Sequence, residues 1–203
     1  MKTAFVLTFS ALLVGHGATA QQLRFGAKAG VNYADLNIRH VGGFKRLLGL
    51  NAGVVGRYAL SSDGFWNLQA ELLYSGKGQR SGGIMRPVGA PAELYHDRIH
   101  CLDLPVLAKI NARGLTVEAG PQLSYVLKAS SETDGGRIDT RDRLRPVQLG
   151  YAVGVGYELP AGYSLTVRYA ADVTSIYKSG PFFDSVHSTA FQAQLGYLLG
   201  KAE

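Results

Sequence analysis

The stretch VQLGYAVGVGYELPAGYSLTVRYAADV, residues 147–173, decides the fold of this chain. Apolar and aromatic residues occupy every second position on both sides of the short segment 160–162. The positions between them hold glycine and small polar or charged residues. Alternation with a period of two residues on either side of a turn predicts a β-hairpin with one strongly apolar face.

The same alternation recurs in six further segments of about ten residues. These segments are 24–33, 48–58, 66–75, 101–110, 115–125 and 188–197. With the two strands of the hairpin they make eight predicted strands. About ten residues are enough for a tilted strand to cross a bilayer.

The predicted connections alternate strictly in length. Short turns fall at 61–64, 111–114 and 160–162, and long connections at about 34–47, 79–97, 129–145 and 178–187. Outer-membrane barrels have short periplasmic turns and longer extracellular loops, whereas a soluble barrel has no reason for this asymmetry. The sequence therefore predicts an all-β fold: an eight-stranded antiparallel up-and-down transmembrane β-barrel with both termini in the periplasm. Its apolar face points to lipid and its small polar face into the lumen, because closure pairs every backbone group.

Aromatic residues are expected at both rims of the lipid-facing surface, where they anchor a barrel at the membrane–water interfaces. Near the short turns these are Phe25, Tyr58, Trp66, Tyr157, Tyr163 and Tyr197. Near the long loops they are Tyr33, Tyr74, Tyr125, Tyr151, Tyr169 and Phe191. A general preference of strands for aromatic residues would not gather them at the two ends of one face.

The N-terminus and the composition indicate an exported protein. Lys2, the apolar run 4–14 and the small residues at 18–20 predict a cleaved signal peptide over residues 1–20, which leaves 21–203 as the barrel domain. Charged residues make up only 18% of the chain, and its mean hydropathy of +0.03 argues against a helical membrane protein. The single cysteine, Cys101, excludes an internal disulfide and is expected to be a buried small side chain.

The inward-facing positions carry charges of both signs. The predicted lumen network consists of Lys28, Arg57, Glu71, Asp103, Lys109, Glu118, Glu158, Arg168 and Asp172. An eight-stranded barrel is only wide enough for its own side chains, and buried charges must pair there. The pattern predicts a plug of salt bridges rather than a water-filled pore, with a gated proton or ion path along the network as the alternative.

Two groups of residues suggest chemistry, but neither has the spacing that the chemistry needs. His96 and His100, with Cys101 beside them, lack a further clear ligand for zinc, so no metal or cofactor is predicted. A nucleophile with its base would have to be assembled from residues near the outer rim, namely Glu93, His187 and Ser188. The prediction is that the protein is not an enzyme. The alternatives are an outer-membrane lipid-modifying enzyme and a secreted lipocalin-like ligand-binding barrel, which would need its apolar face inside.

Four segments resemble a known family: ELLYSGKG (71–78), LDLPVLAKI (102–110), GPQLSYVL (120–127) and VGVGYELPAGYSLTVRYAADVTSIY (153–177). They are similar to the outer membrane protein β-barrel domain family, the porin-family or PorT-like proteins of Bacteroidota. The resemblance implies an OmpA- or OmpX-like barrel in the outer membrane and no established activity. The chain departs from the pattern in its final residues, LGYLLGKAE, where such barrels end on an aromatic residue that the insertion machinery reads.

The long loops are the expected recognition surfaces, since loops carry binding. Their basic residues are Arg39, Lys45 and Arg46 in the first long loop and Arg137, Arg141, Arg143 and Arg145 in the third. These cations would suit lipopolysaccharide phosphates, although the mixed charges of the third loop also fit a solvated loop. The net charge of +6 favours anionic headgroups over nucleic acid in an exported chain. The expected partners are therefore outer-membrane lipids, lipopolysaccharide and the insertion machinery.

Overall fold

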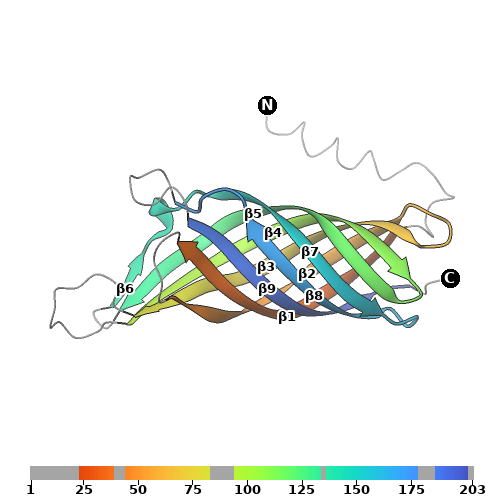
Figure 1. The fold of residues 1–203 in the computed structure, drawn as a ribbon, viewed down its shortest axis with the longest axis horizontal. Coiled ribbons are helices and arrows are strands. Elements are labelled where there is room, and N and C mark those ends of the chain that lie inside the picture. The colour runs from red at the N-terminus through yellow and green to blue at the C-terminus, as the bar shows by residue number, and fades with distance from the viewer. Residues whose placement is uncertain (1–22, 39–43, 83–93, 134–135, 178–185, 201–203) are drawn as a thin grey trace, which may run out of the picture.

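The computed structural model describes residues 23–38, 44–82, 94–133, 136–177 and 186–200. Eight of its strands close into one barrel (Figure 1). They are β1 (Leu23–Ile38), β2 (Phe44–Ala59), β3 (Trp66–Gly82), β4 (Leu94–Ala112), β5 (Leu115–Thr133), β7 (Val147–Glu158), β8 (Tyr163–Asp172) and β9 (Val186–Leu198). A ninth strand, β6 (Gly136–Asp139), pairs only with the end of β5, and a 3-10 turn, η2 (Arg141–Arg143), follows it. No described helix is long and apolar enough to cross a membrane.

Each barrel strand pairs antiparallel with its neighbours, and β1 closes the barrel on β9. The closing ladder runs from Gly26 opposite Leu198 to Ile38 opposite Val186. Closure leaves no barrel strand with an unpaired edge, as hydrocarbon requires. The predicted fold class, an eight-stranded up-and-down barrel, is confirmed.

The short turns lie together at one end of the barrel, the right-hand end in Figure 1. Each contains a glycine with a positive φ: 67° at Gly64, 96° at Gly114 and 91° at Gly162. Glycine adopts this left-handed conformation without the steric cost that a Cβ brings. The positions of these turns could be predicted from the sequence, because a tight turn depends on the glycine within it and not on distant parts of the chain.

The strands are longer than predicted at the opposite end. Strands β4 and β5 have 19 residues each, against the roughly ten expected from alternation. Much of the connections predicted at 34–47, 79–97 and 129–145 is therefore strand, while 178–185 lies outside the described residues. Apolar alternation reports only the part of a strand that faces lipid. A backbone ladder continues past the membrane whatever the side chains are, as long as the neighbouring strand continues too.

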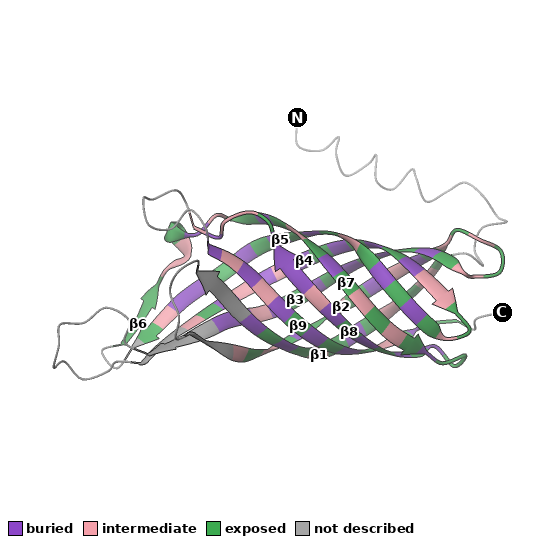
Figure 2. Cartoon of the chain, viewed as in Figure 1, coloured by how far each residue is buried: buried purple, intermediate pink, exposed green. Residues whose placement is uncertain are grey.

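The two faces of the wall follow the alternation (Figure 2). Apolar side chains such as Leu68, Val153 and Val167 are exposed on the outside, and polar ones such as Gln148 are buried inside. Ala171 differs from the prediction, because it belongs to the outward set and is nevertheless buried. Its cross-strand neighbours carry larger side chains that flank its methyl group.

Two inward glycines are required by close approach of the backbone. A Cβ at Gly30 would overlap the carbonyl oxygen of Ala193 on β9, and one at Gly53 would overlap that of Leu72 on β3. Small inward residues at such points allow the wall to curve and leave room for long side chains from other strands. The glycine-rich inner face is thus a consequence of closing the barrel.

Candidate functional site: the charged lumen and its outer cap

Ten charged side chains lie buried within the described part of the barrel, five basic and five acidic. They are Lys28, Arg57, Lys77, Lys109 and Arg168, and Glu71, Asp103, Glu118, Glu158 and Asp172. Nine of them are the residues named from the sequence, and Lys77 is the addition. Every barrel strand except β9 supplies at least one, so closure brings distant parts of the chain to one set of contacts.

Arg168 lies at the centre of the largest group. Its Nη1 and Nη2 donate to the two carboxylate oxygens of Glu71 at 2.8 and 2.9 Å. Its Nε donates to Glu118 Oε1 at 2.9 Å, and its Nη2 also contacts that oxygen. Lys28 Nζ binds Glu71 Oε1 at 2.6 Å from the other side. Two-pronged guanidinium–carboxylate contacts of this kind fix both geometry and charge.

A second group lies next to it, toward the short turns. Arg57 Nη1 donates to both carboxylate oxygens of Glu158 at 2.7 Å. Gln69 links the two groups, because its Oε1 accepts from Arg57 at 3.0 Å and its Nε2 donates to Glu71 at 2.6 Å. Lys109 Nζ lies 3.5 Å from Glu118 and 3.8 Å from Glu158, which makes the seven charges of both groups one network.

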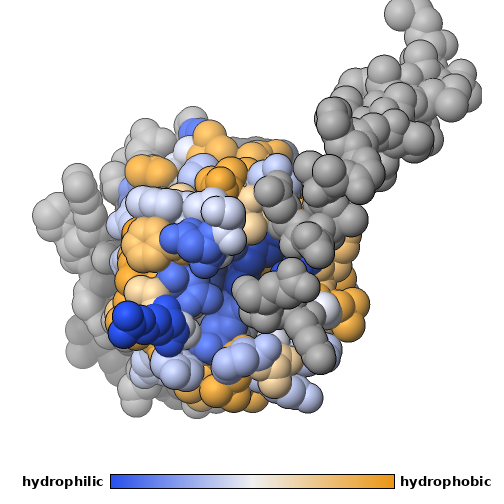
Figure 3. Space-filling view, turned by 90° about the vertical axis from the view of Figure 1, so that its right-hand side faces the viewer, coloured by the Kyte–Doolittle hydropathy of each residue, from blue (hydrophilic) through white to orange (hydrophobic). Residues whose placement is uncertain are grey.

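The charged network reaches the barrel opening at the short-turn end. Hydrophilic residues gather in the middle of that end and hydrophobic residues surround them (Figure 3). Arg24 lies at this mouth, 3.9 Å from Glu158, and donates to the carbonyl of Gly200 at 2.6 Å. Arg24 therefore fastens the end of β9 to the start of β1, at the seam where the barrel closes.

Toward the long loops the charges are fewer. Lys77 Nζ binds Asp103 at 3.0 Å and lies 3.4 Å from the hydroxyl of Ser124. Asp172 is buried nearby and interacts with both charges, but within the described residues it makes no salt bridge, and its Oδ2 has no hydrogen-bond partner there. The structure therefore brings Asp103 and Asp172 to Lys77 and not to the Arg168 group. The alternation of β3, continued past Ser75, was the signal that would have identified Lys77.

Beyond the charged residues, on the side of the long connections, lies an apolar cluster of buried residues, here called the outer cap. Its members are Ile99, Cys101, Val126, Ala129, Leu144, Ile176 and Val186. Leu144 follows η2 and Ile176 follows β8, and both are buried against residues of β4, β5 and β9. Backbone hydrogen bonds hold them, from Arg145 N to Ile176 O at 2.8 Å and from Ile176 N to Val186 O at 2.9 Å.

The outer cap was missed from the sequence. Leu144 falls in the long connection predicted at 129–145, and Ile176 falls between the predicted hairpin, which ends at 173, and the connection predicted at 178–187. Their only signal was an isolated apolar residue within a polar stretch, which is common on protein surfaces. Cys101 lies in the cap as a buried small side chain.

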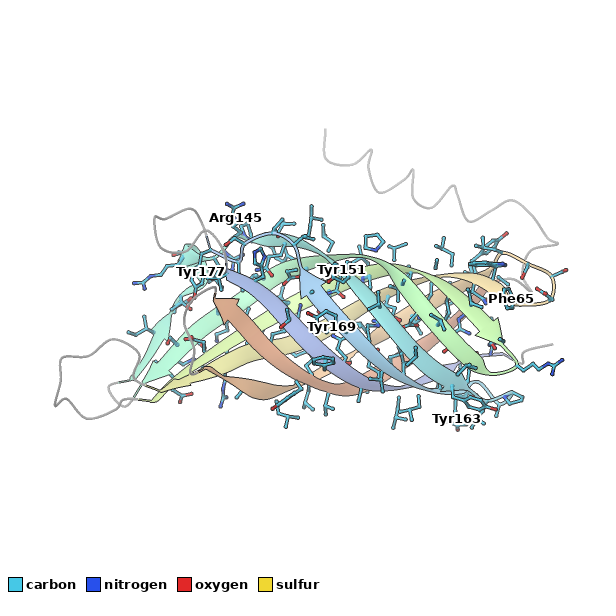
Figure 4. The ribbon with its side chains drawn as sticks, in the orientation of Figure 1. Phe65, Arg145, Tyr151, Tyr163, Tyr169 and Tyr177 are labelled. Carbon is cyan, nitrogen blue, oxygen red and sulfur yellow. The ribbon has the colours of Figure 1, made fainter. Side chains whose placement is uncertain are left out.

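The aromatic residues named from the sequence lie on the outside of the wall in two zones. At the short-turn rim the rings of Tyr163 and Tyr197 are 4.8 Å apart. At the other rim Tyr169 lies 5.0 Å from Phe191 and 6.5 Å from Tyr151 (Figure 4). Most of the twelve are exposed, while Tyr169 is partly covered by its neighbours. Exposed rings at two levels suit a bilayer with two interfaces.

One apolar hollow lies on the outside of the barrel, away from the lumen. It is a shallow depression of about 650 Å³ on the lipid-facing wall near the short turns, lined by residues such as Phe25, Val54, Leu72 and Tyr197. Hydrocarbon chains of the bilayer would fill it. A lipocalin-like carrier needs the reverse arrangement, with an apolar interior, whereas this interior holds the charges.

The described members of the two groups considered for chemistry do not point toward one another. His100 points outward, where its Nδ1 lies 2.6 Å from the hydroxyl of Tyr74, and Cys101 points inward. His187 and Ser188 are consecutive in β9 and so lie on opposite faces. The side chains of Glu93 and His96 lie outside the described residues. No group of three or more metal-binding side chains occurs in the described part of the chain.

Comparison with known proteins gives a family and a fold. Residues 19–177 match the model of a family described as outer membrane protein beta-barrel domain. The structure is similar to Neisserial surface protein A, with 15% identity, coverage of 85% of this chain and 96% of that one, and a TM-score of 0.56. Ail of Yersinia pestis gives 14% identity, coverage of 88% and 99%, and a TM-score of 0.48. OprG of Pseudomonas aeruginosa gives 10% identity, coverage of 87% of this chain and 94% of that one, and a TM-score of 0.44. No curated protein matched the sequence.

Proposed function

Because this chain belongs to the outer membrane protein beta-barrel domain family and lies in the bacterial outer membrane, we propose that it acts through its outer surface and wall, with a closed lumen. The family and the location predicted from the four resembling segments are confirmed. The proposed role is structural or surface interaction and is non-enzymatic. Its partners are the lipids of the outer membrane, and the insertion machinery would deliver it there.

The ion-pair network is the observation that carries this proposal. Five acidic and five basic side chains are buried inside the barrel, where an open channel would hold water. An eight-stranded barrel has room for its own side chains, whereas water-filled porins have about 16 strands. The outer cap would add a second barrier, because its apolar side chains, Leu144 and Ile176 among them, are buried at the end toward the long connections.

The first test is electrical. Purified protein in planar bilayers is expected to show at most small, rare openings. Replacing the central pair, in the variant Arg168→Ala with Glu71→Ala, removes long side chains from the lumen and should increase the frequency of openings. Lys128→Ala on the outer wall is the matched control and should behave as the wild type. A steady conductance of the wild type comparable to that of a large porin would overturn the closed lumen.

The second test is topological. The short turns are expected in the periplasm and the extended strand ends outside the cell. An epitope tag inserted at Gly136, which has open space around it, should be labelled by antibody on intact cells. A tag at Asp63, in the short turn between β2 and β3, should be labelled only after the outer membrane is permeabilised. The reverse pattern would show that the barrel is inserted the other way.

A further inference from the structure

One part of the outer wall carries cations where the rest of the wall is apolar. Arg98 and Lys128 are exposed and point outward from β4 and β5. Lys128 is opposite His100 in the ladder, and Arg98 is opposite Ser130. Arg137 on β6 joins them, because its guanidinium donates to the hydroxyl of Ser130 at 2.8 Å.

Arg141 is the fifth residue of this surface, which is here called the basic wall. Its members are Arg98, His100, Lys128, Arg137 and Arg141. Arg141 Nη2 lies 3.4 Å from the hydroxyl of Tyr125, at the aromatic rim. The imidazole of His100 is stacked on Tyr74 with 5.8 Å between ring centres. The surface therefore begins at the rim and continues outward over β4, β5 and β6.

The height of the basic wall corresponds to lipid headgroups. Tyr74, Leu102 and Tyr125 form one row of the ladder at the aromatic rim. His100 and Arg98 come two and four residues further along β4, about 7 and 13 Å along the strand. Strand tilt of roughly 40° reduces this to about 5 and 10 Å along the membrane normal. The headgroup region of a bilayer is about 5–7 Å deep on each side, so these two side chains lie at and just above it.

The basic wall has few counter-charges of its own. Within the described residues neither Arg98 nor Lys128 makes a salt bridge, in contrast to the paired charges of the lumen. Of the nearby acids, Glu132 is opposite Arg137 in the ladder. The carboxylate of Asp139 accepts the backbone N–H of Arg141 at 2.9 Å. Two cations therefore face the outer leaflet without a carboxylate partner.

We propose that the basic wall binds the phosphate groups of a phosphorylated glycolipid of the outer leaflet, of the lipid A type. The site rests on the proposed surface role, which places this end of the barrel outside. Guanidinium and ammonium groups bind phosphate oxygens through charge-assisted hydrogen bonds, and Arg does so with two donors at once. The acyl chains of the same lipid would lie along the apolar wall below Tyr74 and Tyr125.

Native mass spectrometry of the detergent-purified protein tests the site with phosphorylated lipid A as the probe. Arg98→Gln together with Lys128→Gln should weaken binding about tenfold or more, since each cation near a charged surface adds to the attraction of anionic lipid. Arg113→Gln is the matched control, because Arg113 is an exposed cation in a short turn at the opposite end. It should change binding less than twofold. All variants are checked for the gel mobility of the folded barrel.

Three further probes separate the possible sources of binding. Lipid A treated with phosphatase should bind the wild type as weakly as phosphorylated lipid A binds the double variant. Equal binding of phosphatidylglycerol, or full competition by inorganic phosphate, would overturn the glycolipid assignment. Unchanged binding by the double variant, or an equal loss in Arg113→Gln, would overturn the site. Conductance is measured in a separate experiment. A porin-like current would therefore refute the closed lumen but would leave the conclusion about lipid A binding unchanged.

Discussion

Arg168→Met is expected to lower the free energy of unfolding by about 3–5 kcal/mol, because it leaves buried carboxylates without their main partner. The guanidinium makes hydrogen bonds to both Glu71 and Glu118, and all three side chains are almost completely buried. The methionine side chain is unbranched and uncharged, and it fills most of the same volume although it is two atoms shorter. The loss is therefore mainly electrostatic rather than a cavity effect.

Urea unfolding of the protein in lipid vesicles measures this loss. Arg113→Met, at an exposed turn, is the control for removing an arginine and should change the free energy of unfolding by less than about 0.5 kcal/mol. Adding Glu118→Gln to Arg168→Met should cost less than the sum of the two single changes, by about 0.5–3 kcal/mol. Additive single effects would mean that Arg168 and Glu118 are not coupled and would count against the proposed ion-pair plug.

Val153→Arg is expected to lower the free energy of unfolding by about 2–4 kcal/mol, because it puts a cation into the hydrocarbon on the lipid side. Val153 lies in the middle of β7 with its side chain exposed on the outer wall. Leu68→Arg on β3 should have a smaller effect, since Leu68 is closer to the short-turn rim and arginine can extend toward the headgroups.

Gln148→Arg is the matched control for both changes. Gln148 is on the inner face of β7, opposite Ser124, and its Nε2 has no hydrogen-bond partner among the described residues. Lys77 is the cation near Asp103 and Asp172, so a second cation there meets an excess of carboxylate. The same vesicle assay should show a clearly smaller loss than for Val153→Arg. Similar losses at both positions would mean that the two faces of the wall are assigned wrongly.

The sequence by itself determined the parts of this protein that depend on neighbouring residues. Alternation depends only on the direction in which successive side chains point, so it identified the eight strands, their two faces and the inward position of nine charges. The short turns were equally readable, because glycine with positive φ is a local requirement. The two aromatic rims followed from the ends of the alternating runs.

Only the tertiary structure decided which residues meet and where the strands stop. Glu71 and Arg168 are 97 positions apart, and their contact depends on the register and tilt that close the barrel. The same closure assigned Lys77, with Asp103 and Asp172, to a separate group, and left Arg98 and Lys128 without carboxylates. The outer cap and the extended ends of β4 and β5 arise from backbone pairing beyond the membrane. Backbone pairing is the same for every residue type except proline, so side-chain patterns carry no record of it.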